Sequence, residues 1–213
     1  MKINKKAHFI TFEGGEGSGK STQIGKLSKV LTEKGYKLKI FHEPGSTPLG
    51  EKVREILLDK KESITHRAEL FLYLSARAQF VEKELIPALQ QSQIILCDRF
   101  SDSTLVYQGK GLGLGVNKIR PFMDFAAHNI EPDLTLILNI NPEQGLKRIK
   151  NRSRDRIEQR PLAFHKKLQS GYSQLKKTHP RRIHIIKVRG INDTHKEILK
   201  VVETHVKRFR KNS

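Results

Sequence analysis

The chain has 213 residues, of which 36% are hydrophobic and 30% charged, and its 15 glycines and 8 prolines are ordinary numbers. This composition supplies a sizeable core and excludes disordered, collagen-like and low-complexity chains. The formal net charge is +19, mostly carried by residues 147–213 with 21 basic and 5 acidic side chains, which favours either polyanionic ligands or a merely solvated basic surface.

Apolar β-branched runs alternate with amphipathic segments along the chain. In chain order the pattern predicts a strand at 8–12, a helix at 20–34, a strand at 37–41, helices at 49–58 and 68–91, a strand at 94–97, a helix at 117–128, a strand at 134–139, a helix from residue 142, another ending near 178, a strand at 183–188 and a helix at 194–209. The glycine-rich stretch 109–115 indicates a loop, and Pro87 a bend in the long helix. The alternation predicts an α/β fold with a five-stranded parallel sheet and helices on both faces. No repeat or linker interrupts it, so we expect one domain over residues 1–213.

The strongest motif directly follows the first predicted strand. Residues 14–22 read GGEGSGKST and match G-x-x-x-x-G-K-[ST] between a strand and a helix, the context that this motif requires. Glycines let successive backbone N–H groups turn toward a phosphate, and the helix N-terminus adds positive potential. The Lys20 ammonium can reach the β- and γ-phosphates, and the Ser21 hydroxyl can hold Mg²⁺. The predicted ATP-binding residues of this loop are Gly14, Gly15, Glu16, Gly17, Ser18, Gly19, Lys20, Ser21 and Thr22.

A second candidate site lies at the carboxyl end of the predicted strand 94–97, where open α/β sheets bind ligands. Asp98 is placed to act near the metal, and Arg99 can hold a phosphate through two parallel hydrogen bonds. On its own, an Asp-Arg pair at a strand end is more typical of a structural ion pair.

Together these stretches resemble the thymidylate kinase family of nucleoside monophosphate kinases. The resemblance covers nearly the whole chain and rests on FEGGEGSGKST at 12–22, EPGST at 43–47, residues 68–79, DRFSDSTLVYQG at 98–109, PDLTLILN at 132–139 and DRIEQR at 155–160. It implies a P-loop kinase fold and the phosphorylation of dTMP to dTDP by ATP with Mg²⁺, which supplies dTTP for DNA synthesis. It also implies a homodimer, for which the apolar run 70–74 and its neighbours are a candidate interface.

Two other functions stay open at this point. One is a kinase for another nucleoside monophosphate, and the other is a P-loop ATPase stimulated by nucleic acid bound to the basic last third of the chain. The aromatic-arginine spacing in 68–79 and the block 98–109 argue against both, so nucleic acid is not the expected partner.

The resemblance implies a set of residues for the acceptor. Glu16 faces the deoxyribose, Tyr73 stacks on thymine, and Arg77, one helical turn later on the same face, donates to a base carbonyl. Plain core packing is an equally good interpretation of Tyr73. The implied dTMP-binding residues are Glu16, Tyr73, Arg77, Arg99, Ser103, Thr104, Tyr107 and Gln108.

The phosphate loop contains no arginine, and the resemblance implies that a mobile arginine-rich lid at about residues 147–160 supplies the catalytic cation. Arg152 is the expected main contact of the γ-phosphate, with Arg148 and Arg156 as further ATP contacts, and Glu158 anchors the lid by ion pairing. The implied catalytic residues are thus Lys20, Arg99 and Arg152. The alternative is a solvated or nucleic-acid-binding basic stretch.

Two departures from the family pattern lie around residues 43–47. His42 stands where arginine is usual and is mostly neutral at pH 7, so a phosphate or carboxylate contact there is weakened or replaced. Ser46 stands where glycine is usual and limits positive φ, which affects the geometry of this loop.

The sequence also indicates the cellular compartment of the protein. No apolar run approaches the roughly 18 residues of a membrane span, and the N-terminus lacks the apolar core of a secretory signal. Cys97 is the only cysteine, which fits a reducing compartment. We therefore expect a cytoplasmic protein without a membrane partner.

Overall fold

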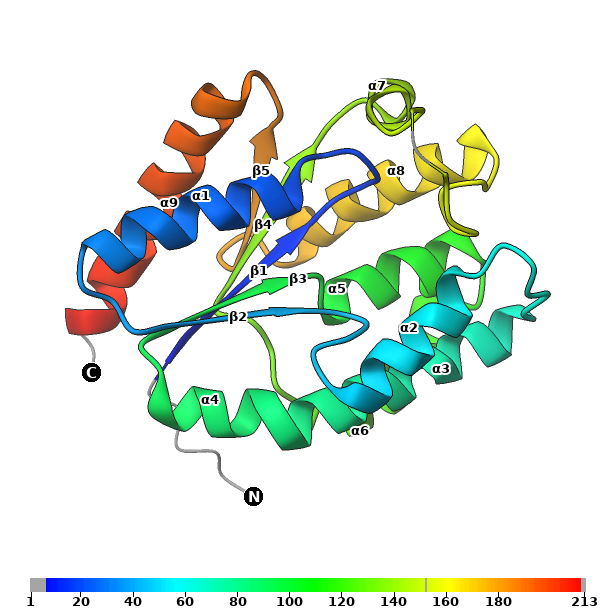
Figure 1. Ribbon diagram of the computed structural model, residues 1–213, viewed down its shortest axis with the longest axis horizontal. Helices are drawn as coiled ribbons and strands as arrows, with labels where there is room; N and C mark the ends of the chain where they lie inside the picture. The colour runs from blue at the N-terminus through cyan, green and yellow to red at the C-terminus, as the bar shows by residue number, and fades with distance from the viewer. Residues whose placement is uncertain (1–6, 152, 212–213) are drawn as a thin grey trace.

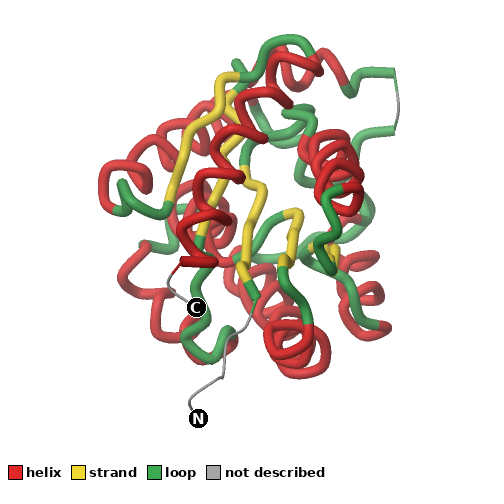
Figure 2. Tube along the Cα trace, turned by 90° about the vertical axis from the view of Figure 1, so that its left-hand side faces the viewer, coloured by secondary structure: helices red, strands yellow, loops and turns green. Residues whose placement is uncertain are grey.

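The computed structural model describes residues 7–151 and 153–211. A parallel sheet of five strands runs through them in the order β2-β3-β1-β4-β5, and helices cover both of its faces (Figures 1 and 2). The strands are β1 (His8–Glu13), β2 (Leu38–His42), β3 (Ile94–Asp98), β4 (Leu134–Asn139) and β5 (Ile183–Lys187). The α-helices are α1 (Lys20–Glu33), α2 (Pro48–Leu58), α3 (His66–Phe80), α4 (Ile86–Gln91), α5 (Ser101–Thr104), α6 (Val116–Ala126), α7 (Pro142–Arg148), α8 (Leu162–Thr178) and α9 (Ile191–Lys211), with π-helical segments η1 (Val81–Leu85) and η2 (Leu105–Gly111).

The central strand β1 shows why the sheet is covered twice. All six of its residues are buried. Ile10 and Phe12 pack into one core with α1 and α9, whereas Phe9 packs into a second core that contains η1 and α4. A strand that is apolar on both faces must be buried on both, which fixes helices above and below it. The predicted α/β fold with five parallel strands is confirmed.

The two neighbours of β1 place the ligand-binding edge. Phe12 lies opposite Asp98 of β3, and Glu13 lies opposite Ile137 of β4. From β1 the chain adds β3 and β2 on one side of the sheet and then β4 and β5 on the other, so the order of strands reverses at β1. Open parallel sheets bind ligands at the carboxyl ends of the strands beside such a reversal. The loops after β1, β3 and β4 therefore meet at one edge.

The segment after β3 departs from the predicted elements. Residues 109–111, predicted as the start of a loop, end the helical stretch formed by α5 and η2. A Cβ on Gly109 would lie 3.2 Å from side-chain atoms of Val116 and Ile119, and one on Gly111 would lie 2.6 Å from the Phe164 ring. These glycines are thus required by close packing against α6 and α8, and a pattern of glycines alone does not distinguish this from a loop.

The long predicted helix 68–91 is helical throughout but irregular near its end. The π-helical segment η1 separates α3 from α4, and Pro87 lies at the start of α4. Proline cannot donate to the preceding turn and its ring crowds the carbonyl four residues earlier, so the extra residue of a π turn relieves the contact. Across the described residues, no helix is both long and apolar enough to cross a membrane.

Candidate active site

The loop between β1 and α1 is shaped by its glycines. Gly14, Gly17 and Gly19 have φ values of 137°, 66° and 89°, which side chains other than glycine rarely adopt. A Cβ on Gly14 would lie 2.5 Å from the Leu138 carbonyl oxygen, and one on Gly17 would lie 2.1 Å from that of Gly145. The loop therefore needs glycine for both conformation and space.

Lys20 begins α1 and turns back over this loop. Its Nζ donates to the carbonyl oxygens of Gly14 and Gly15 at 3.4 Å each. Burial, followed by the nearby Arg99 guanidinium, lowers the pKa of Lys20. The long hydrogen bonds leave the ammonium close to the space above the loop, where a phosphate would bind.

The next residue, Ser21, points toward β3. Its hydroxyl donates to Asp98 Oδ2 at 2.9 Å. Both side chains offer oxygen ligands of the kind that Mg²⁺ prefers. In kinases, Mg²⁺ usually binds one or two protein oxygens, and phosphates and water complete its coordination shell. The pair predicted as metal-binding therefore fits that ion.

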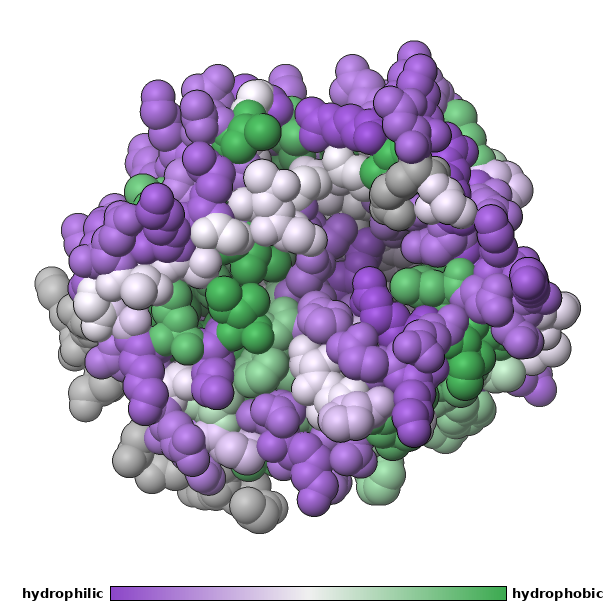
Figure 3. Space-filling view, viewed as in Figure 1, coloured by the Kyte–Doolittle hydropathy of each residue, from purple (hydrophilic) through white to green (hydrophobic). Residues whose placement is uncertain are grey.

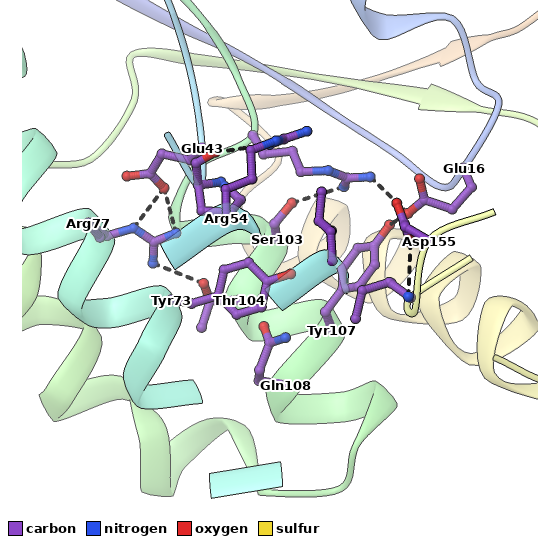
Figure 4. A pocket seen from close by; sticks show the side chains of 14 residues that line it. Glu16, Glu43, Arg54, Tyr73, Arg77, Ser103, Thr104, Tyr107, Gln108 and Asp155 are labelled. Atoms are coloured by element: carbon purple, nitrogen blue, oxygen red, sulfur yellow. Dashed lines mark hydrogen bonds and ion pairs between the residues drawn. The ribbon is translucent and has the colours of Figure 1, made fainter. Parts of the chain in front are cut away.

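Two adjoining cavities open at this edge of the sheet, and Figure 3 shows a hollow on this face lined mainly by hydrophilic residues. The larger is lined by phosphate-loop residues from Glu16 to Thr22 together with Asp98. The smaller is lined by all eight residues predicted to bind dTMP (Figure 4). Glu16 and Arg99 belong to both linings. The two predicted binding sites are thus continuous with one another.

Arg77 is held in the smaller cavity by a buried ion pair. Its Nε and Nη2 donate to Glu43 Oε2 at 2.9 and 2.7 Å, and its Nη1 donates to Thr104 Oγ1 at 2.9 Å (Figure 4). The two charged side chains are only 3% and 4% exposed. Burial raises the pKa of Glu43 despite the lowering effect of Arg77. A guanidinium has five N–H groups, so Arg77 keeps donors for a ligand beside Tyr73, which lines the same cavity.

Where the cavities meet, Glu16 binds two side chains through one oxygen. Its Oε1 accepts hydrogen bonds from Arg99 Nη2 at 3.0 Å and from the Tyr107 hydroxyl at 2.7 Å. Burial favours the protonated carboxyl, but the charges of Arg99 and Lys20 outweigh it and lower the pKa of Glu16. Glu16 is therefore an ionised hydrogen-bond acceptor at the junction of the two cavities.

The predicted lid arginines lie in different places. Arg148 Nη1 donates to the Gly17 carbonyl oxygen at 3.3 Å, so its side chain reaches the phosphate loop. Arg156 instead forms an ion pair with Glu69 at 2.7 Å, and its Nε donates to the Leu57 carbonyl oxygen. Its guanidinium is thus directed to the acceptor side of the cleft in this structure. Arg152 lies outside the described residues.

Glu69 is a site residue that the sequence analysis did not identify. It is fully buried on α3 and binds Arg156 and Arg160 through Oε2, at 2.7 and 2.6 Å. Its Oε1 accepts a hydrogen bond from Gln108, which lines the acceptor cavity, at 3.0 Å. The sequence places this acid directly before the apolar run 70–74, but that position alone does not indicate that it is buried.

Asp102 was also missed, although it lies in the block 98–109. Arg182 donates to both of its carboxylate oxygens at 2.6 and 2.9 Å, and Thr135 donates at 2.9 Å. These bonds fasten α5 to β4 and to the start of β5. Asp102 therefore supports the helix that carries Ser103 and Thr104.

The loop 43–47 accommodates its two departures. Ser46 adopts a φ of 62°, so serine does not prevent the left-handed conformation there. Its Oγ accepts the His42 backbone N–H at 2.8 Å, and its own N–H donates to Glu51 Oε1 at 2.8 Å. The His42 ring lies 2.8 Å from the same Glu51 oxygen. The histidine contact at this position is therefore with a carboxylate.

Comparison with known proteins agrees with this geometry. The thymidylate kinase family model matches residues 12–198. A thymidylate kinase of Thermoanaerobacter sp. (strain X514) is 43% identical over 94% of this chain and 100% of the relative, and one of Bacillus pumilus is 38% identical over 94% and 97%. The crystal structure of thymidylate kinase from Ehrlichia chaffeensis superposes with a TM-score of 0.76 at 31% identity, covering 92% of this chain and 98% of that one. The matched region contains the residues of both cavities.

Proposed function

The chain belongs to the thymidylate kinase family, and on this premise we propose how its residues divide the ATP-dependent phosphorylation of dTMP to dTDP. The observation that carries the assignment is the continuity of the two cavities, which share Glu16 and Arg99. Phosphoryl transfer requires donor and acceptor phosphates in line within one water-poor space. An acid and an arginine side by side within this shared wall suit the point where the acceptor phosphate meets the γ-phosphate.

dTMP occupies the smaller cavity in this proposal. Tyr73 stacks on the base, and the remaining N–H donors of Arg77 bind a base carbonyl, which favours thymine or uracil over cytosine. Tyr107 packs against the deoxyribose, and Glu16 accepts from its 3′-hydroxyl. Ser103, Thr104 and Gln108 line the rest of the base and sugar site, and Arg99 holds the acceptor phosphate.

ATP occupies the larger cavity. The phosphate loop from Gly14 to Thr22 surrounds its β- and γ-phosphates, and Lys20 neutralises their charge. Ser21 and Asp98 would hold Mg²⁺, which would supply positive charge that stabilises the negative charge developing on the phosphates. Arg148, which already contacts the loop, and Arg152 supply positive charge from the lid at residues 147–160, while Arg156 stays paired with Glu69.

A second copy of the chain covers an apolar patch on α3 and α6. Phe71, Phe122 and Phe125 are 53%, 50% and 86% exposed, and the rings of the first two meet edge to face at 5.8 Å. Exposed aromatic clusters of this kind mark protein–protein contacts. Sedimentation analysis should show a dimer for the native chain and a monomer for Phe122→Ser/Phe125→Asp, and a monomeric native chain would contradict this part of the proposal.

An ADP-release assay tests the function. Each nucleoside monophosphate is supplied with ATP and Mg²⁺, and DNA or RNA is supplied in parallel without a monophosphate. We expect the highest kcat/KM with dTMP and no stimulation by nucleic acid. Preference for a purine monophosphate would overturn the acceptor assignment, and stimulation by nucleic acid alone would favour the ATPase alternative.

A further inference from the structure

The last residue of β1, Glu13, is a buried carboxylate immediately before the phosphate loop. It is fully inaccessible to solvent. Its Oε1 accepts the Phe100 backbone N–H at 2.8 Å, and its Oε2 accepts the hydroxyls of Ser103 and Tyr172 at 2.5 and 2.9 Å. Three donors from the β3–α5 turn, α5 and α8 therefore converge on one side chain that itself lines neither cavity.

Glu13 stabilises the turn between β3 and α5, and this turn contains Arg99. Arg99 has a φ of 72°, a left-handed conformation that is strained for a residue with a side chain. The backbone bond from Phe100 to Glu13 fixes the residue that directly follows. Arg99 Nη1 also donates to Ser103 Oγ at 3.2 Å, so Ser103 accepts from Arg99 and donates to Glu13. Glu13 thus acts on both the backbone and the side chain of Arg99.

A carboxylate in this place is expensive for folding. No ion pair of Glu13 is present among residues 7–151 and 153–211, and the like charge of buried Asp102 lies nearby. Burial first, and Asp102 second, raise the pKa of Glu13 to about 7. The titratable groups that face it, from every element packed around it, are Lys20, Cys97, Arg99, Asp102, Tyr172 and Arg182. An apolar residue would fill the space with less penalty, so packing alone does not account for an acid at this position.

We propose that Glu13 is a positioning residue that holds Arg99 in the orientation required for the acceptor phosphate, through Ser103 and the Phe100 backbone. Arg99 Nη1 donates to the Gly14 carbonyl oxygen at 3.0 Å, and this contact marks the held orientation. The proposal rests on the proposed role of Arg99 in the reaction. Glu13 sets the orientation of the Arg99 guanidinium from the buried side of the turn, outside both cavity linings.

The first test is a double-mutant cycle between Glu13 and Arg99. Glu13→Gln should lower kcat/KM for dTMP about 10²-fold, the usual effect of a misplacement near 1 Å, with KM for ATP unchanged within about twofold. In an Arg99→Ala background the same substitution should have no further effect, since groups that act through one another are not additive. An undiminished effect in that background would overturn the proposal.

A milder variant guards against misfolding of Glu13→Gln. Tyr172→Phe removes one hydrogen bond to Glu13 and a longer contact of 3.3 Å with Ser103 Oγ, while Tyr172 itself lines neither cavity. It should lower kcat/KM for dTMP about threefold to tenfold. Tyr36→Phe, which deletes a hydroxyl beyond the far end of α1, is the matched control and should leave it unchanged. Equal values for the two tyrosine variants would contradict the positioning role.

Crystal structures separate this proposal from the assignment of Arg99. In Glu13→Gln the Arg99 guanidinium should leave the Gly14 carbonyl oxygen, whereas an unmoved guanidinium would overturn the proposal regardless of activity. Arg99→Ala by itself tests the proposed function: if it retains most of the native kcat, the role of Arg99 fails while the structural result on Glu13 still decides the positioning claim.

The pH profile supplies a readout that a purely structural role would not change. At saturating substrates, kcat of the native enzyme should fall on the acid side of about pH 7 as Glu13 becomes protonated and stops accepting both hydroxyls. Tyr172→Phe should move this limb to higher pH, because the charged carboxylate loses a donor. Glu13→Gln should abolish it, and an unchanged limb in both variants would contradict the proposal.

Discussion

Replacing Arg77 by alanine separates the structural and substrate roles of one side chain. The substitution removes a proposed donor to the thymine base and also leaves the carboxylate of Glu43 buried without its partner. Both effects reduce activity, so Arg77→Ala alone cannot distinguish them. Adding Glu43→Gln removes the buried charge but restores no donor to the base, and the double variant therefore isolates the contribution to substrate binding.

The structure sets the size of each effect. Breaking a buried ion pair by removing one partner costs about 3–5 kcal/mol, which is about 6–20 °C in Tm for a chain of this length. Glu43→Gln should then recover about 1–3 kcal/mol, the penalty of an unsatisfied buried group. Loss of a donor to a base carbonyl costs a similar about 1–3 kcal/mol, which is about 5- to 150-fold in kcat/KM.

The pH dependence of stability gives an independent check on the single variant. Burial already raises the pKa of Glu43, and removal of the Arg77 charge raises it further. The folded variant then holds a proton that the unfolded chain releases above its ordinary pKa of 4.5, so stability falls as pH rises from 4.5 toward the folded pKa. The double variant lacks this group and should not show the fall.

The assay combines thermal unfolding with steady-state kinetics at fixed protein concentration. We expect Arg77→Ala/Glu43→Gln to regain stability but not kcat/KM for dTMP, while the Kd of an ATP analogue stays within about twofold of the native value in both variants. Recovery of dTMP use together with stability would show that Arg77 only supports the fold and would refute its placement at the base.

Three further predictions concern other parts of the site. Lys20→Ala should reduce kcat about 10²-fold or more with a native circular dichroism spectrum, and retention of most of kcat would contradict its role. Arg152→Ala should lower kcat on the order of 10³-fold, whereas Arg156→Ala should mainly lower Tm because it leaves buried Glu69 with one guanidinium fewer; equal kcat losses would argue against this difference. Since the folded pKa of Glu13 is about 7 against 4.5, the native chain should lose about 3 kcal/mol of unfolding free energy relative to Glu13→Gln between pH 4 and pH 8. Denaturant titrations across that range measure this loss, and a constant difference would be contrary to it.

Much of the fold follows from the sequence because buried parallel strands are continuous apolar runs. The strand at 134–139 was predicted with the bounds of β4, since each of its first five residues is buried. The helical stretch after β3 was only partly predicted. Its glycines Gly109 and Gly111 serve close packing, and the partners that require them lie on α6 and α8, which are distant in the sequence.

The candidate site was predictable only where a motif fixes the chemistry. The phosphate loop was identified from its local motif and the eight acceptor residues from the resemblance to the family, and the structure gathers them at one edge of the sheet. Arg156 was expected at the phosphates, but the structure pairs it with Glu69, because that acid is buried within reach. Sequence patterns count an acidic residue as surface, so no local signal indicates that Glu13, Glu69 or Asp102 is inside.

These buried acids explain how the site keeps its arginines in place before substrate binds. An arginine side chain loses conformational entropy when its guanidinium is fixed in one position. If substrate binding has to fix it, this entropy loss weakens the binding of the substrate. Glu43 holds Arg77 and Glu69 holds Arg160 through ion pairs that are already formed, so this loss is met during folding. Both carboxylates are buried, and Arg77 keeps further N–H groups at the lining of the smaller cavity. Positive charge that is already fixed in place needs little reorganisation as the transition state forms. Folding and catalysis therefore depend on the same few buried acids.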